Sequence, residues 1–101
     1  MAIYQLADYR VKASAVDSVK RAIKELVSYI EANEPGTHVY LAWQAKEDPT
    51  RFVHIFIFEN DNAHKRHGQS EAVRRFEAVY KPELVSDGVT FTHYEQMAGK
   101  R

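Results

Sequence analysis

Cysteine is absent from this sequence of 101 residues, which excludes disulfide bonds, thiolate metal sites and a cysteine nucleophile. No apolar run approaches the roughly 20 residues that a membrane-spanning helix needs. Neither charge is in excess, because lysine plus arginine and aspartate plus glutamate each number 14. A nucleic acid or an anionic membrane surface is therefore not an expected partner.

Two further absences concern targeting and nucleotide binding. The first residues, Met1 to Gln5, lack the charged and then apolar order of a signal peptide, so we expect a cytoplasmic protein. The four glycines are scattered singly, which excludes a glycine-rich phosphate-binding loop. Hydrophobic residues make up 45% of the chain and aromatic residues 12%. A chain of this length builds one core but not two, so we expect a single domain over residues 1–101.

The spacing of apolar side chains predicts the element order β-α-β-β-α-β. Ser14 is a suitable N-cap for the first helix and Ser70 for the last one. Asp48-Pro49 is a typical turn start between two strands that form a hairpin, and Asp87-Gly88 opens the final strand. The predicted strands cover residues 2–11, 37–46, 51–59 and 89–97, and the helical segments cover 14 to about 33, 60–68 and 70 to about 82. This order predicts a ferredoxin-like α+β fold, with both helices on one face of a four-stranded antiparallel sheet.

The strand predicted over residues 51–59 is apolar on both faces. Its odd residues are Val53, Ile55 and Ile57, and its even residues are His54, Phe56 and Phe58. Two helices cover only one face of such a sheet. We therefore expect a second copy of the chain to cover the face that carries Phe56 and Phe58, in a homodimer.

The hairpin gives a prediction for the sole tryptophan. If the loop has an even number of residues, such as 47–50, Trp43 lies opposite His54 and on the same side of the sheet. Aromatic rings and one imidazole would then line that face. The alternative is that Trp43, Phe56 and Phe58 form an ordinary dimer core around a hydrogen-bonded interior His54.

The order of these features resembles a known family. The resemblance rests on the spacing of Trp43, Glu47-Asp48-Pro49, Phe52, Phe58-Glu59, Ala63, His67, Ser70 and Phe76. This pattern resembles the antibiotic biosynthesis monooxygenase superfamily of small dimeric α+β barrels. The resemblance implies a homodimeric barrel, and often an enzyme that oxidises quinols, anthrones or similar phenolic rings with O2, without flavin or metal.

The resemblance also implies a site. The positions of His54, Phe58 and His64 match those of an asparagine, a tryptophan and a tyrosine that line the cavity of an anthrone-oxidising member, so aromatic character is kept at one of the three. We expect His54 to act as base or hydrogen-bond donor, because an imidazole titrates near neutral pH. The expected entrance and wall residues are His64, His67, Trp43, Phe56, Phe58 and, at the rim, Tyr4.

Several alternatives concern the same residues. His67 has a structural interpretation, as a cap or packing residue of its short helix. Haem-degrading relatives carry a tryptophan where this chain has His67 and a haem-ligating histidine where it has Glu77, so we expect no haem oxygenase activity. His64 and His67 have the spacing of metal ligands, but a third ligand would have to come from Glu59 or Asp61, and we expect no metal. Asp8 would be a second base if it faced inward.

The expected function is a cofactor-independent monooxygenase that acts on a small aromatic, quinol-like or anthrone-like substrate with O2. The competing hypothesis is a non-catalytic dimeric barrel that uses the same cavity to bind a small molecule or serves a stress response. A ligand-sensing module, like the effector domains of some regulators, is a third interpretation. Fold alone does not separate these, because function depends on the site.

Overall fold

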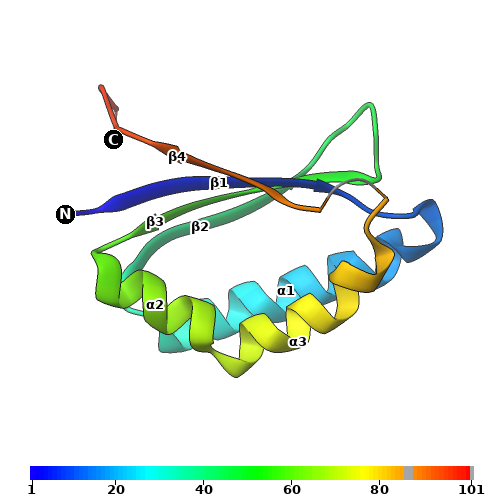
Figure 1. Ribbon diagram of the computed structural model, residues 1–101, viewed down its shortest axis with the longest axis horizontal. Coiled ribbons are helices and arrows are strands. Elements are labelled where there is room, and N and C mark those ends of the chain that lie inside the picture. Colours follow the sequence, from blue (N-terminus) through cyan, green and yellow to red (C-terminus); the bar gives the residue numbers. More distant parts are fainter. Residues whose placement is uncertain (86–87, 101) are drawn as a thin grey trace.

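The computed structural model describes residues 1–85 and 88–100 and has two layers (Figure 1). One layer is an antiparallel sheet of β1 (Ile3–Arg10), β2 (Thr37–Gln44), β3 (Arg51–Phe58) and β4 (Thr90–Tyr94), in the order β2-β3-β1-β4. The other layer consists of α1 (Val16–Asn33), α2 (Asp61–Gln69) and α3 (Glu71–Tyr80), all on one face of the sheet (Figure 1). The predicted ferredoxin-like α+β fold is confirmed. Within the described ranges, no helix is long and apolar enough to cross a membrane.

Side-chain caps mark the start of α2 and α3 but not of α1. Asn60 accepts a hydrogen bond from the Ala63 N–H at the start of α2, and Ser70 accepts one from the Val73 N–H at the start of α3, as predicted for Ser70. The predicted Ser14 cap is wrong. A 3-10 turn, η1 (Ala13–Ala15), precedes α1, and Ala15 occupies the N-cap position without a side-chain bond. That turn buries Ala15 in the core and leaves Ser14 inside the turn instead of at its end.

The last strand is shorter than predicted. It pairs with β1 from Thr90 to Tyr94, and Asp87, predicted to open it, lies outside the described residues. Gly88 has a φ of 103°, a conformation that favours glycine. A second 3-10 turn, η2 (Lys81–Glu83), follows α3 with Pro82 in its first turn. The chain therefore leaves the helical layer at the proline and returns to the sheet edge.

The two faces of β3 are the reverse of the prediction. Phe52, His54, Phe56 and Phe58 are buried and face the helices, while Val53, Ile55 and Ile57 are half-buried on the other face. The prediction that a second copy covers Phe56 and Phe58 is therefore wrong for this face. The helices can cover it because Phe76 and Tyr80 of α3 pack toward the same aromatic side chains.

The predicted pairing of the hairpin is also wrong by one residue. Trp43 pairs with Val53 and Gln44 with Phe52, so the strands are symmetric about Asp48 and the loop is odd. Asp48 fixes this loop, because its carboxylate accepts hydrogen bonds from the N–H and the hydroxyl of Thr50. One residue of register moves every side chain to the opposite face. Trp43 therefore lies on the face away from His54.

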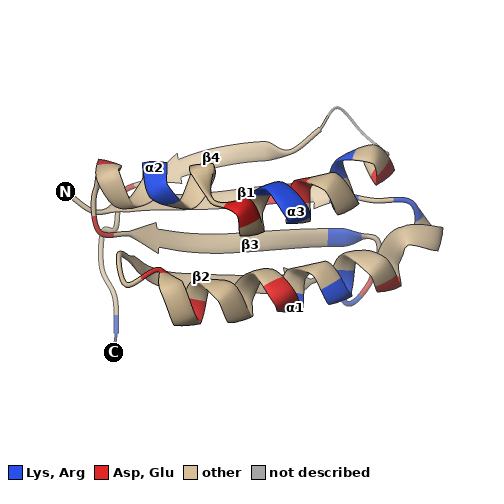
Figure 2. Cartoon of the chain, turned by 90° about the horizontal axis from the view of Figure 1, so that it is seen from below, with Lys and Arg blue, Asp and Glu red and all other residues tan. Residues whose placement is uncertain are grey.

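Charged residues are unevenly distributed over the elements. Figure 2 shows them along the helices and near strand ends, while the central length of β3 carries none.

The face of the sheet that no described helix covers is apolar on β2 and β3. Its residues there are Val39, Leu41, Trp43, Val53, Ile55 and Ile57. We call these six residues the open face.

Candidate functional site

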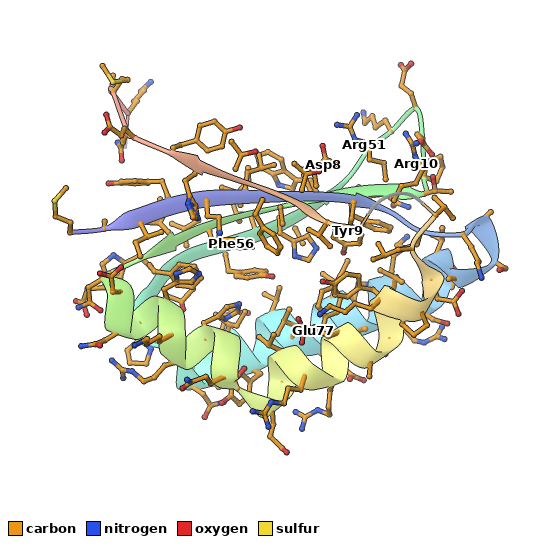
Figure 3. The ribbon with its side chains drawn as sticks, viewed as in Figure 1. Asp8, Tyr9, Arg10, Arg51, Phe56 and Glu77 are labelled. Atoms are coloured by element: carbon orange, nitrogen blue, oxygen red, sulfur yellow. The ribbon has the colours of Figure 1, made fainter. Side chains whose placement is uncertain are left out.

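A cavity of about 320 Å³ lies between the sheet and the helices. This volume is at the lower end of the range of about 300 to 1,000 Å³ that small-molecule sites occupy. Figure 3 shows Tyr9 and Phe56 pointing from the sheet toward the helical layer, on the same side as Glu77 of α3. The lining is mostly aromatic and histidine, with Gln5, Tyr9, Tyr40, His54, Phe56, His64, His67, Phe76, Glu77, Tyr80 and Phe91 among its residues.

His54 is held between two tyrosine hydroxyls at the sheet side of the cavity. Its Nε2 lies 2.8 Å from the Tyr9 hydroxyl and its Nδ1 lies 2.8 Å from the Tyr40 hydroxyl. The imidazole is only 2% exposed. Because β1 and β2 flank β3 on both sides, Tyr9 and Tyr40 reach the same ring from opposite neighbours. Both nitrogens of His54 are thus occupied by protein groups.

Burial fixes the protonation of these three groups. It lowers the pKa of His54 to about 4, so the imidazole is neutral at pH 7. Burial also raises the pKa of Tyr9 and of Tyr40 far above their ordinary value, so both hydroxyls keep their protons. A neutral imidazole has one N–H and one lone pair, so one tyrosine donates to the ring and the other accepts from it. The accepting tyrosine has a hydroxyl proton left for a molecule in the cavity.

His67 occupies the helical side of the cavity and has a carboxylate partner. Its Nδ1 lies 2.9 Å from Glu34 Oε1, and the two side chains are 11% and 9% exposed. Glu34 is the C-cap residue of α1, so this contact joins the end of α1 to α2. The His67 ring also packs on Tyr40 and Phe58, with centroids 5.5 and 5.2 Å apart. The ring is held in a single orientation by these contacts.

His64 lies nearer to solvent on α2. Its ring stacks on Phe58, with centroids 4.8 Å apart, and partial burial lowers its pKa. Since His64 contacts Phe58 and His67 contacts Glu34, the two histidines have different partners. In residues 1–85 and 88–100, no group of three or more His, Asp or Glu side chains could hold a metal ion.

The structure brings together five of the seven predicted site residues. His54, His64, His67 and Phe56 line the cavity, and Phe58 packs directly against Phe56 and both α2 histidines. Trp43 and Tyr4 do not line it. Trp43 is on the open face, and Tyr4 pairs with Ile57 and therefore faces the same way.

Three residues that bond the site histidines were not among the predicted site residues: Tyr9, Tyr40 and Glu34. Tyr9 and Tyr40, like Tyr4, are strand tyrosines suited to a cavity rim or an interface, but only Tyr4 was chosen. The parity of β1 contains a usable signal, since Gln5, Ala7 and Tyr9 alternate with Tyr4, Leu6 and Asp8. Tyr40 would have followed from an odd hairpin loop, which pairs it with Phe56. Nothing in the local sequence places Glu34 beside His67, because that contact depends on how α1 and α2 meet.

Comparison with known proteins agrees with this architecture. The family described as Antibiotic biosynthesis monooxygenase matches residues 2–79 of the sequence. The chain belongs to this family. No curated protein matches the sequence.

Solved structures of the antibiotic biosynthesis monooxygenase fold are similar over nearly the whole chain. A candidate antibiotic biosynthesis monooxygenase from Bacteroides thetaiotaomicron has a TM-score of 0.89 at 15% identity, covering 96% of this chain and 90% of its own. A candidate from Caulobacter crescentus has a TM-score of 0.86 at 18% identity, covering 96% and 91%. One from Nitrosomonas europaea has a TM-score of 0.85 at 17% identity, covering 95% and 90%. At these low sequence identities the similarity shows a shared fold and nothing about activity.

Proposed function

We propose that the cavity binds a small planar aromatic molecule with a phenolic hydroxyl, and that the protein oxidises this molecule with O2 as a cofactor-independent monooxygenase. The observation that carries the proposal is the Tyr9–His54–Tyr40 arrangement in an aromatic cavity. Phe56, Phe76 and Tyr80 provide ring surfaces for stacking. The spare tyrosine proton provides a donor for a carbonyl or phenolate oxygen of the ligand.

The chemistry needs a ligand that can itself reduce O2. When a quinol or an anthrone loses a proton, the electron pair that stays behind makes an anion rich enough to pass one electron to O2. Recombination with the reduced oxygen forms a carbon–oxygen bond. Loss of water then leaves a carbonyl, so that a CH2 group plus O2 becomes C=O plus H2O. The protein must bind the ring, move the protons and keep bulk water away from the anion.

In this proposal His54 is a neutral positioning group, not the base. Its two nitrogens are occupied and its pKa is low, so it fixes which tyrosine hydroxyl has a free proton. A hydroxyl donor aimed at an oxygen stabilises that oxygen as negative charge develops on it. In this proposal a tyrosine hydroxyl is the donor to the ligand, so His54 has neither of the two roles expected from the sequence, base or donor.

The same observation also supports a second candidate function. A cavity whose central imidazole is neutral and already hydrogen-bonded is suited to binding a phenolic or carbonyl ligand without any reaction. A non-catalytic small-molecule-binding protein would use the same aromatic walls and the same donor.

Oxygen uptake separates the two functions. Purified, metal-stripped protein is assayed against naphthalene diols, quinols and anthrones, with autoxidation subtracted, beside His54→Ala and the control His38→Ala. His38 is half exposed and lies outside the cavity. Saturable uptake that falls by about 10²-fold or more in His54→Ala alone supports the monooxygenase, because the variant loses the group that positions the hydroxyl donor. Saturable ligand binding without oxygen uptake above the blank supports the binding protein.

We also propose that the functional unit is a homodimer formed through the open face. Proteins of this family are commonly dimeric. Leu41 and Trp43 are 46% and 54% exposed, and both belong to the open face. Large contiguous apolar patches on a soluble chain are typical of interfaces. In a symmetric dimer the open faces of the two copies would cover each other and remove both from water.

A further inference from the structure

We propose that Glu34 and His67 form the base of this site, in which His67 Nε2 takes the phenolic proton of the ligand and Glu34 is a positioning residue that stabilises the resulting imidazolium. This inference rests on the proposed phenol site and identifies the group that ionises the ligand. It concerns proton transfer alone, so it can be tested without oxidation.

The geometry of the pair sets the tautomer of His67. A carboxylate accepts hydrogen bonds, so the 2.9 Å contact between Glu34 Oε1 and His67 Nδ1 places a proton on Nδ1. Nε2 then carries the lone pair that a base needs. Among the described residues Nε2 has no hydrogen-bond partner, and it is not a buried unpaired atom. His67 lines the cavity, so this nitrogen is available to a ligand there.

Glu34 has an unbonded carboxylate oxygen. Its Oε1 is shared by His67 and by the Thr37 hydroxyl, 2.7 Å away, but its Oε2 is the buried side-chain oxygen or nitrogen without a partner in the described part of the chain. A buried carboxylate oxygen without a partner is costly unless a positive charge lies nearby. If His67 takes the proton of the ligand, the resulting imidazolium lies against this carboxylate, with Nδ1 2.9 Å from Oε1. Glu34 is therefore placed to stabilise the charge that the proton transfer creates.

Other candidates for the base are less suitable. His54 has both nitrogens occupied by tyrosine hydroxyls. His64 stacks on Phe58 and has no bonded carboxylate in the described residues. Glu77 lines the cavity, but its carboxylate forms an ion pair with Lys81 at 3.0 Å. Among the histidines of the described residues, only His67 has one nitrogen without a partner and a buried carboxylate on the other.

The proton transfer needs no other reactant. The O–H bond of the phenol breaks, the proton forms a new N–H bond on Nε2, and the electron pair stays on the oxygen as phenolate. Nδ1 keeps its proton throughout and donates a hydrogen bond to Glu34 Oε1. The phenolate oxygen can then accept a hydrogen bond from the free hydroxyl proton of Tyr9 or Tyr40. The ligand oxygen thus interacts first with His67 on the helical side of the cavity and then with a tyrosine on the sheet side.

The test uses 4-nitrophenol, which is not easily oxidised and whose phenolate is yellow. The visible band of the bound ligand is followed against pH in the wild-type protein, in Glu34→Gln and in the matched control Glu31→Gln, an exposed glutamate three residues earlier. The titratable groups that contact His67 or line the same cavity are Glu34, Tyr9, Tyr40, His54, His64, Glu77 and Tyr80. Glu34 is changed in the test variant, and the others are common to all variants.

We expect the wild-type site to lower the apparent pKa of bound 4-nitrophenol relative to free ligand. Glu34→Gln should raise that apparent pKa by about 1 or more while Glu31→Gln leaves it unchanged. His67→Gln, a second variant that removes the acceptor itself, should abolish the shift. Affinity for the protonated ligand should change little, which a merely structural role of Glu34 would not produce.

An apparent pKa that is the same in wild type, Glu34→Gln and His67→Gln would overturn the inference while leaving the phenol site intact. Absence of 4-nitrophenol binding would overturn the phenol site, and this inference with it. Ionisation that depends on Glu34, together with no oxygen uptake from any quinol, would support the inference and contradict the monooxygenase.

Discussion

Arg51 binds both carboxylate oxygens of Asp8. Arg51 Nε and Nη2 lie 3.1 and 2.6 Å from Oδ1 and Oδ2, across the pairing of β1 with β3. The hydrogen bond from Arg51 lowers the pKa of Asp8, so this carboxylate stays ionised. Figure 3 shows Asp8 and Arg51 on the side of the sheet away from Tyr9 and the helices. Asp8 is therefore not a base in the cavity.

Asp8→Asn should leave ligand binding unchanged. The affinity for 4-nitrophenol should stay within about twofold of wild type, because the substitution lies outside the cavity. The free energy of unfolding should fall by no more than about 1 kcal/mol, since the ion pair is partly exposed. The lowered pKa means that this contribution is present above the ordinary pKa of aspartate and is lost as the pH falls through the lower value of the folded state. Urea unfolding at neutral and acidic pH measures both effects, and a large loss of affinity would contradict the placement of Asp8.

His54 should make the protein less stable below neutral pH. Its pKa of about 4 in the folded state is below the ordinary value near 6.5, so the unfolded chain binds more protons between these values. Stability should therefore fall as the pH drops through about 6.5 and level off near 4, by up to about 3 kcal/mol in total.

Urea unfolding from pH 7.5 to 4 checks this pH dependence in wild type and His54→Gln. The variant cannot titrate at this position and should have a shallower slope. His38→Gln, which changes an exposed histidine, should keep the wild-type slope. Equal slopes in wild type and His54→Gln would show that His54 is not the buried neutral group described above.

Tyr9→Phe and Tyr40→Phe should each destabilise the fold. Each removes the only described partner of one buried nitrogen of His54, which costs about 1 to 3 kcal/mol. The two costs should not add, since both hydroxyls bind one ring. Denaturant unfolding of the two variants, their double variant and the control Tyr29→Phe measures this coupling. Additive effects would contradict a shared imidazole.

Trp43 should report the proposed dimer. As the sole tryptophan, it is about half exposed in one chain and lies beside Leu41 on the open face. Its fluorescence emission should shift to shorter wavelength as protein concentration rises through the dissociation constant. Light scattering should give twice the chain mass for wild type and the mass of one chain for Leu41→Glu, because a buried charge without a partner disfavours association. A single-chain mass for wild type at all concentrations would contradict the dimer.

Helices and strands could be predicted from the sequence more reliably than the face of the sheet that the helices cover. The α1 and α3 patterns, the Ser70 cap and the hairpin are local features, and each is set by a few neighbouring residues. The two faces of β3 are both apolar, so composition does not tell which one the helices cover. The choice depends on Phe76 and Tyr80, which lie some twenty residues further along.

The remaining errors have a common physical origin. The position of Trp43 depends on whether the hairpin loop is odd or even, and the bonds between Asp48 and Thr50 decide it. The Glu34–His67 pair joins two helix ends separated by 33 residues. Such contacts arise only when the layers pack, whereas the histidines themselves could be selected from residue type and motif spacing.

The alternation of β3 has a practical consequence for redesign. His54, Phe56 and Phe58 are buried under the helices, while Val53, Ile55 and Ile57 face the opposite side of the sheet. The same eight-residue strand therefore contributes one set of residues to the cavity side and a separate set to the open face. Substitutions at even positions can retune ligand choice while the outward surface stays the same, and odd positions can be altered for assembly. Insertion of a single residue would exchange both sets at once. The strand should therefore accept many substitutions but no change of length.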